Sequence, residues 1–500
     1  MRRFVVLALV WVVGLLVASC AGGEVADPLR VDALHPASES ENVWIRDPVW
    51  VRFSEPVDPA TVTPARVVVS SAEVASLAKD LSLSADGLTL SITLTEQPAL
   101  PASLTVALSR DIATADGRRL VPPSDGWWWK LPAWQAMGGA LDLDLGHMAV
   151  DPHVAVGPDG PVVVWSEQVS GVWEVHVKAW TGDAWTALGG ALNHGPTNHT
   201  ERSRIAVDAS GTPVVTWSEW HAGDWNVYAK RWDGSAWTLL GANPLDAEAA
   251  RDAHASDVVS DGSDVWIAWD EPSDAGWGVQ VRRWDGSGWA AAGGLATDPA
   301  WGAVGPAIAL GHDGYPFVAI TMWGHETWQD VRLTRWTGSQ WVALGGAVDV
   351  VEDRHADVQT VTVDADGAPV VVWEESVIGD EGKTDVRVHA KRWDGVAWSS
   401  LGGPLNVAHP EPSNAYDPSA TVDAEGRPVA VWREDGVLGI RVYAKRWTGT
   451  AWEAMGGPIS DRWSGPPDVA VDDDGVVYVA WFERNDPTDD VYVKRFNELP

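Results

Sequence analysis

Apolar and polar residues alternate in short runs along most of the chain, which is typical of β-strands with one buried face. In the first third, such runs include Val49–Phe53, Leu88–Leu94 and Leu104–Leu108, and Asp-Gly turn signals lie between them. Further along, continuous apolar runs such as Val162–Trp165 recur at regular distances. The pattern predicts an all-β protein.

One strand pattern repeats through residues 133–500. Its landmark is a Trp-x-Gly-x-x-Trp hairpin, whose second Trp recurs at intervals of 52, 52, 52, 57 and 54 residues. A period near 50 residues with several strands per unit is typical of β-propeller blades. Each unit fits four strands, A to D, with the Trp-x-Gly turn between C and D. The second Trp of each hairpin is Trp185, Trp237, Trp289, Trp341, Trp398 or Trp452.

The ends of the repeat array indicate how the ring closes. Strands A, B and C occur seven times, but only six of these units are followed by a strand D. The missing strand D precedes the first unit, because the segment from Trp134 to Leu141 matches the segment from Trp452 to Ile459. Pairing the two ends of a ring leaves no open sheet edge. We therefore predict a seven-bladed propeller of four-stranded blades, closed by its first and last strands.

Residues 26–132 form a separate module of short strands, which fits a small β-sandwich. The run from Phe53 to Val62, with Asp86-Gly87 and Asp116-Gly117-Arg118, resembles the bacterial Ig-like domain of the SbsA type. The resemblance implies a spacer between membrane and propeller. The module departs from the family at Trp127-Trp128-Trp129, where we expect at least one ring to pack on the next domain.

The N-terminus carries an export signal. Arg2 and Arg3 precede a 14-residue apolar run, Phe4–Val17, which has the length of a signal-peptide core. The following Val17-Ala18-Ser19-Cys20 resembles the bacterial lipobox. The resemblance implies that residues 1–20 comprise the signal and the lipobox cysteine, that Cys20 is lipidated, and that the protein is anchored in the cell envelope. Ala21, in place of Asp, implies the outer membrane.

Charge and composition limit the partners. The chain has 35 Lys and Arg against 70 Asp and Glu, a net charge of −35, which repels phosphate backbones and excludes nucleic acid as a partner. Repeat positions account for most of its 34 Trp residues, which we therefore assign to the core. No phosphate loop, serine elbow or zinc motif occurs, so we predict no catalytic residue, metal or cofactor. The pattern leaves the oligomeric state open.

Glutamates recur two residues after the strand-B Trp in six units. A ring of carboxylates could collect a cation, but we expect these residues to pair with the recurring lysines of strand C. The glutamates are Glu167, Glu219, Glu271, Glu375, Glu434 and Glu483, and the lysines are Lys178, Lys230, Lys391, Lys445 and Lys494.

The B–C and D–A loops share one face of a propeller, and here they are long and varied. Variation on one rim of a rigid ring is where such folds carry function. Trp173, Trp225 and Trp277 recur at one repeat position, so we assign them to blade packing. The predicted ligand-binding residues are the non-repeating Trp220, His221, Trp301, Trp323, His325, Trp328, His355, Tyr416 and Trp463.

These features predict a lipid-anchored, non-enzymatic scaffold that binds an extracellular glycan or protein ligand. Two alternatives stay open: a sialidase-like or other glycan-directed hydrolase, and purely structural display. The Asp-Gly turns are similar to the Asp-box of sialidases, with a spacing that differs by one residue. Acidic residues are too abundant for the sequence to single out a catalytic pair.

Overall fold

The computed structural model describes residues 27–500 except 125, 209, 247–250, 275, 295–301, 324–328, 351–353, 380–381 and 408–412. Cys20, Trp301, His325 and Trp328 lie outside the described residues. Within the described part the chain forms strands and one short 3-10 helix, η1 (Pro59–Thr61), so the predicted all-β class is confirmed. No helix there is long and apolar enough to cross a bilayer.

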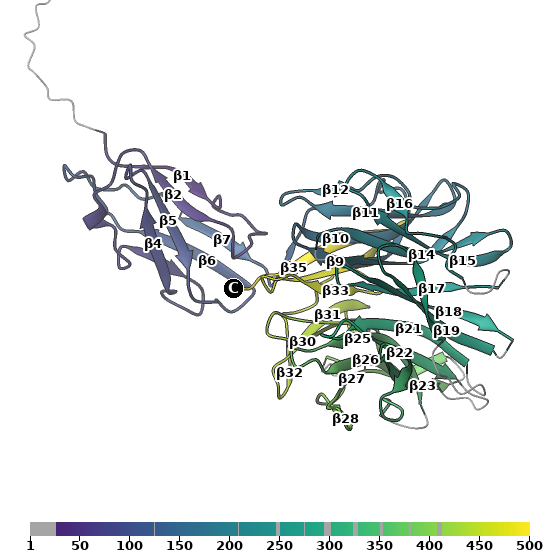
Figure 1. Ribbon diagram of the computed structural model, residues 1–500. Helices are drawn as coiled ribbons and strands as arrows, with labels where there is room; N and C mark the ends of the chain where they lie inside the picture. The colour runs from purple at the N-terminus through teal and green to yellow at the C-terminus, as the bar shows by residue number, and fades with distance from the viewer. Residues whose placement is uncertain are drawn as a thin grey trace, which may run out of the picture.

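The N-terminal module is a sandwich of two antiparallel sheets (Figure 1). Trp127 and Trp129 are each 1% exposed and lie in the core of this sandwich. The indole N–H of Trp127 donates to the carbonyl oxygen of Pro36 at 2.9 Å. One sheet contains β1 (Val31–His35), β2 (Val49–Phe53), β5 (Thr89–Leu94) and β4 (Lys79–Leu83), and the other β3 (Val67–Ser70), β6 (Ala102–Leu108) and β7 (Trp127–Leu131).

Seven four-stranded antiparallel sheets follow, and they form the predicted propeller (Figure 1). We number the blades 1 to 7 and call their strands A to D from the axis outward. Blades 1 to 3 contain β9 (Ala149–Gly157), β10 (Gly160–Val169), β11 (Val172–Trp180) and β12 (Trp185–Ala187); β13 (Thr200–Val207), β14 (Pro213–His221), β15 (Asp224–Trp232) and β16 (Trp237–Leu239); and β17 (His254–Ser260), β18 (Val265–Ser273), β19 (Gly276–Trp284) and β20 (Trp289–Gly294).

The remaining blades repeat this order. Blades 4 to 6 contain β21 (Gly302–Leu310), β22 (Pro316–Trp323), β23 (Gln329–Trp336) and β24 (Trp341–Ala343); β25 (His355–Val363), β26 (Pro369–Gly379), β27 (Gly382–Trp393) and β28 (Trp398–Ser400); and β29 (Ala415–Val422), β30 (Pro428–Glu434), β31 (Arg441–Trp447) and β32 (Trp452–Ala454). Blade 7 contains β33 (Asp468–Val471), β34 (Val477–Asn485), β35 (Thr488–Phe496) and β8 (Trp134–Ala136).

Blade 7 closes the ring as predicted. Its outermost strand is β8, from the start of the repeat array, and β8 pairs antiparallel with the final strand β35. Trp134 lies opposite Phe496, and Ala136 lies opposite Lys494. The ring therefore has no unpaired seam at this position.

A ring of tryptophans joins each blade to the next, and we call it the outer ring. The indole N–H of each strand-D Trp donates to a backbone carbonyl of the preceding blade, at 2.5 to 3.2 Å. The residue after that carbonyl is a glycine with φ between 68° and 83°, a conformation that favours glycine. A Cβ at Gly189 would lie 3.2 Å from Trp237 and 3.3 Å from Trp232. The outer ring is Trp134, Trp185, Trp237, Trp289, Trp341, Trp398 and Trp452.

The strand-B glutamates accept hydrogen bonds from tryptophans and loops. The sequence analysis expected them to pair with the strand-C lysines, and this expectation was wrong. Each carboxylate accepts the indole N–H of the Trp two residues earlier, at 2.6 to 3.3 Å. Several also accept loop backbone N–H groups, as Glu219 does from His194 and Gly195. The strand-C lysines lie over the same Trp rings, 5.6 to 5.8 Å from their centroids, and donate to backbone carbonyls. These glutamates therefore have a structural role.

The Ig-like module is attached to the propeller through the chain's C-terminal end. Asn497 is fully buried, and its side chain accepts the N–H of Ile45 at 2.6 Å and donates to the carbonyls of Val43 and Pro132 at 2.9 Å. The Arg495 guanidinium lies 3.4 Å from the Trp44 ring centroid. Trp44 packs against the cores of both modules. The junction thus uses Trp44, whereas Trp127 and Trp129 serve the sandwich.

Candidate functional site

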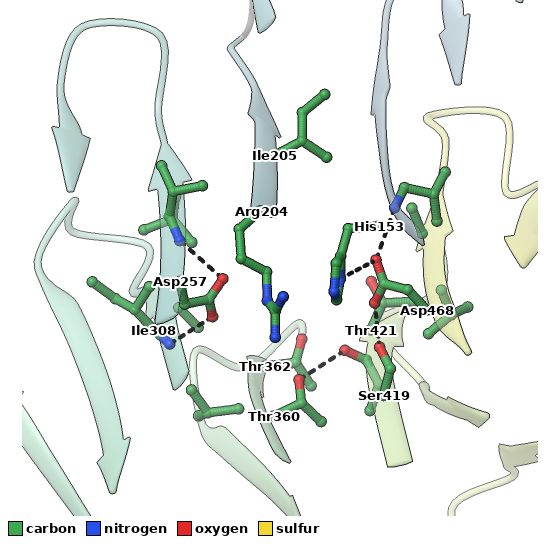
Figure 2. Close-up of a pocket in the computed structure, with 18 of the residues that line it drawn as sticks. His153, Arg204, Ile205, Asp257, Ile308, Thr360, Thr362, Ser419, Thr421 and Asp468 are labelled. Carbon is green, nitrogen blue, oxygen red and sulfur yellow. Dashed lines mark hydrogen bonds and ion pairs between the residues drawn. The ribbon is translucent and has the colours of Figure 1, made fainter. Parts of the chain in front are cut away.

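The innermost strands of the seven blades surround a cavity of about 720 Å³ on the propeller axis (Figure 2). Its lining comes from all seven strands A and from the residues just before β33. A volume of this size is typical of small-molecule sites. We call it the axial cavity.

One position of strand A recurs around this cavity, and strand pairing identifies it. In each blade it lies opposite the residue that precedes the large strand-B residue, which is Trp in six blades and Ile320 in blade 4. Six of the seven side chains line the cavity, Ala307 being the exception. We call the set the axial ring: His153, Arg204, Asp257, Ala307, Thr360, Ser419 and Asp468.

Asp468 is an ionised member of the ring. It accepts the backbone N–H of Val154 at 2.9 Å and the Ser419 hydroxyl at 2.6 Å, and His153 Nδ1 lies 3.3 Å away (Figure 2). Burial disfavours its charge, but His153 and the hydrogen bonds outweigh burial and hold the pKa of Asp468 below its usual value. The side chain keeps 17% exposure, so it can reach a ligand.

Asp257 behaves in the opposite way. Its two oxygens accept the backbone N–H groups of Val258 and Ile308, both at 2.9 Å. Burial raises its pKa, against the Ile308 hydrogen bond and the charge of Arg204. One ring therefore holds two carboxyl groups whose pKa values are shifted in opposite directions.

Arg204 extends from β13 into the space between Asp257 and His153 (Figure 2). Its Nη1 donates to the carbonyl oxygen of Ser203 at 3.0 Å. Hydroxyl groups complete this part of the wall, from Thr360 and Thr362 on β25 and from Ser419 and Thr421 on β29. The cavity therefore offers cationic, acidic and neutral polar groups together.

A repeated backbone irregularity shapes the loop-rich end of the cavity. Asp151, Arg202 and Asp417 have φ of 51°, 52° and 47°, and Gly305 has 56° at the corresponding place in blade 4. The A–B pairing shifts register next to these residues, as in a β-bulge. Left-handed backbone at non-glycine residues costs about 1 to 3 kcal/mol and is concentrated at functional sites.

The structure separates most of the residues that the sequence analysis placed on the rim. Trp220 and Trp323 are 42% and 44% exposed and lie on blades 2 and 4. His221 is exposed beside Trp220, and His355 is half-buried at the start of β25. Tyr416 and Trp463 come together, because the Arg433 guanidinium lies 5.6 Å and 6.0 Å from their ring centroids. Their ligand-binding role stays a prediction.

Two tryptophans that the sequence analysis assigned to packing are half-buried at the rim. Trp225 and Trp277 lie 6.0 Å and 6.1 Å from the ring of His254, the first residue of β17. His254 Nδ1 is 2.9 Å from Glu201, which adjoins Arg202 at the cavity mouth. Both aromatic rings therefore lie beside the imidazole of this pair.

Sequence reasoning missed the axial ring. Its members lie 12 or 13 residues before the large strand-B residue, so repeats aligned on that residue show one variable, often polar position only when a gap is placed in the A–B turn. Among the described residues, no group of three or more His, Cys, Asp or Glu side chains is arranged to hold a metal ion.

Comparisons with known proteins identify the first module and give structures that are similar to much of the chain. Residues 25–130 match the bacterial Ig-like domain family. No curated protein matches the chain. The chain is similar to a protein of unknown function from Dyadobacter fermentans DSM 18053, at 13% identity and a TM-score of 0.46, over 73% of this chain and 99% of that one.

Several of the similar structures have a named activity. One is an ulvan lyase, a polysaccharide lyase, with 12% identity and a TM-score of 0.46 over 69% of this chain and 93% of that one. Another is an α-L-arabinanase from Penicillium chrysogenum, with 14% identity and a TM-score of 0.44 over 60% of this chain and 94% of that one. These likenesses concern the fold.

The predicted non-enzymatic binding scaffold is corrected by these comparisons. The similar structures with a named activity include glycan-acting enzymes: arabinofuranosidase, arabinanase, ulvan lyase and sialidase. The prediction rested on the absence of catalytic sequence motifs, and the acidic residues that line the axial cavity come from different blades and form no motif. The comparisons favour the glycan-directed alternative.

Proposed function

We propose that the propeller is a glycan-directed hydrolase whose reaction takes place in the axial cavity. The observation that carries this proposal is the presence of Asp257 and Asp468 in one ring with pKa values shifted in opposite directions. Glycoside hydrolysis uses two carboxyl groups, one protonated and one ionised. Environments that separate two carboxyl pKa values in one cavity supply these two roles.

The chemistry assigns one proton transfer to each group. Asp257 donates its proton to the glycosidic oxygen as the bond from that oxygen to the anomeric carbon breaks. A water molecule adds to the anomeric carbon, and Asp468 takes the proton that the water releases. His153 and Ser419 hold the Asp468 carboxylate in place, so they are positioning residues.

The proposal also covers location. Residues 25–130 match a bacterial Ig-like domain, and such domains occur in bacterial surface proteins. The lipobox-like segment ending at Cys20 supports a lipid anchor in the cell envelope, in the outer membrane of a diderm bacterium. The Ig-like domain then connects the anchor to the enzyme.

The test is turnover of a panel of fluorogenic glycosides and polysaccharides, read by fluorescence and by new reducing ends. Wild-type protein should cleave at least one substrate, and Asp257→Asn and Asp468→Asn should each lower kcat/KM by about 100-fold or more. Asp366→Asn is the matched control, because Asp366 is 85% exposed on an A–B turn. Absence of turnover on every substrate, or full activity in both ring variants, contradicts the proposal.

A further inference from the structure

The charges of the axial ring are satisfied at every ionisable member except one. Asp468 has His153 and Ser419, and Asp257 has two backbone N–H groups. The Arg204 guanidinium has the Ser203 carbonyl, and within the described part of the chain no carboxylate lies within ion-pair distance of it. A half-buried guanidinium carries five N–H donors, so most of its bonding capacity is open to the cavity.

Many arginines of this propeller pair with a carboxylate. With a net charge of −35, acidic partners are abundant. Arg231 pairs with Asp208 at 2.6 Å, Arg283 with Asp264 at 2.5 Å, and Arg446 with Glu498 at 2.9 Å. Those arginines lie outside the axial cavity. Arg204, in contrast, lies in the cavity near Asp257 without an ion pair within the described residues.

A second arginine lies on the same strand. Arg202 also lines the cavity, two residues before Arg204, in the left-handed backbone of the bulge. Its contacts with carboxylates are long, 3.7 Å to Glu201 and 4.0 Å to Asp270. β13 thus presents two cationic groups along the path from the loop-rich mouth to the axial ring.

We propose that the axial cavity takes a sugar residue that bears a negative charge, whose carboxylate or sulfate group is held by Arg204. The planar guanidinium matches both anions with two parallel hydrogen bonds, which a neutral sugar does not offer. Thr360, Thr362 and Thr421 supply hydroxyls for the uncharged groups of the sugar. The sugar component of this inference rests on the proposed function, whereas anion binding by Arg204 does not.

Anion binding would also assist the proposed acid. The charge of Arg204 favours the ionised form of Asp257. When a bound carboxylate or sulfate neutralises that charge, the ionised form loses this support, and Asp257 holds its proton more firmly. The same contact would then select the substrate and maintain the proton donor.

The first experiment is a glycan array that carries uronic acid, sulfated and neutral glycans. Asp257→Asn protein is used, so that bound glycans are not cleaved. The bound set should consist of acidic glycans, and the array distinguishes carboxylate from sulfate as the recognised group. A bound set of neutral glycans, or no bound glycan at all, overturns the inference.

The second experiment assigns the contact. Calorimetry with the glycan that binds most tightly on the array should show about 10- to 100-fold weaker binding in Arg204→Gln. Binding should recover in part in Arg204→Lys, which keeps the positive charge but loses the two parallel N–H donors of the guanidinium. Arg231→Gln is the matched control, because Arg231 pairs with Asp208 away from the cavity. Unchanged binding in Arg204→Gln overturns the assignment. Thermal unfolding verifies that each variant is folded.

The outcomes distinguish the two proposals. Cleavage of neutral glycans alone would retain the hydrolase and remove the acidic-sugar inference. Binding of acidic glycans without cleavage by wild-type protein would retain acidic-sugar binding and remove the hydrolase. Added salt should weaken the binding of acidic glycans, because screening reduces charge attraction.

Discussion

The outer ring and the axial ring each take one equivalent residue from every blade, but they differ in uniformity. The outer ring is Trp at all seven positions, and every indole makes the same hydrogen bond to the preceding blade. The axial ring contains six residue types at seven positions. Equivalent positions that build the ring keep one residue, whereas those that face the cavity are free to differ. Three substitutions test this comparison.

The largest expected effect is on the outer ring at the closing blade. Trp134→Ala removes a side chain that is 5% exposed, together with its hydrogen bond to Met455. We expect the free energy of unfolding to fall by about 3 to 5 kcal/mol, as for other buried aromatic truncations. Urea unfolding measures the change. Trp134→Phe should lose less, and a loss below about 1 kcal/mol for the alanine variant would contradict a structural role for this ring.

A smaller effect is expected in the axial ring. His153→Gln keeps a hydrogen-bonding group near Asp468 but removes the positive charge that lowers the pKa of Asp468. The pKa of Asp468 should rise, so the acidic limb of the kcat/KM profile should move to higher pH, with about 10-fold lower activity on that limb. Unfolding stability at neutral pH should stay near wild type. If the acidic limb of the kcat/KM profile does not shift, His153 is not a positioning residue for the reaction.

The smallest expected effect concerns a position where different residues perform one structural task. Asp142, Asn193 and Asn406 each follow a strand D and accept a backbone N–H of strand C. Burial raises the pKa of Asp142 to about 7, with Asp490 adding to the rise. The folded state then holds a proton that the unfolded chain releases near pH 4, so wild-type stability falls as the pH rises from about 4 to about 7.

Asp142→Asn removes this dependence while keeping the acceptor that Asn193 and Asn406 provide. The variant should be about 1 kcal/mol more stable than wild type above pH 7, and the difference should disappear below about pH 4. Chemical unfolding across this pH range measures it. Asn193→Ala is a useful contrast, because it removes the acceptor and should destabilise at every pH. A gain at low pH in Asp142→Asn would contradict the account.

The blade count and the closure followed from the sequence because the residues that make them are uniform. Trp-x-Gly-x-x-Trp recurs in six blades, and the segment after Trp134 supplies the missing strand. The axial ring did not follow, since the A–B turn between an axial-ring residue and the strand-B landmark differs in length among the blades: it joins Gly157 to Gly160 in blade 1 and Val207 to Pro213 in blade 2. The separation is 12 residues from His153 to Trp165 but 13 from Arg204 to Trp217. One residue reverses the face of a strand.

The chemistry of the glutamates was also misread for a physical reason. The sequence analysis paired Glu219 with Lys230 because their charges are opposite. However, the buried indole N–H of Trp217 needs a hydrogen-bond acceptor. The Glu219 carboxylate is that acceptor, at 2.9 Å. Lys230 then lies over the ring of Trp217 and donates to the Leu192 carbonyl. Buried polar groups need hydrogen-bond partners, so donors on aromatic rings decide such arrangements as strongly as net charge does.

The buried Asn497 has a consequence for access to the cavity. It fixes the Ig-like domain to blade 7, and Arg46 of that domain contacts the Asp474 carbonyl on an A–B turn, at the end opposite the loop-rich mouth. The domain is therefore attached at the end of the propeller that carries the A–B turns. These contacts leave the loop-rich mouth of the axial cavity clear of the Ig-like domain, which is the access that the proposed glycan substrate requires.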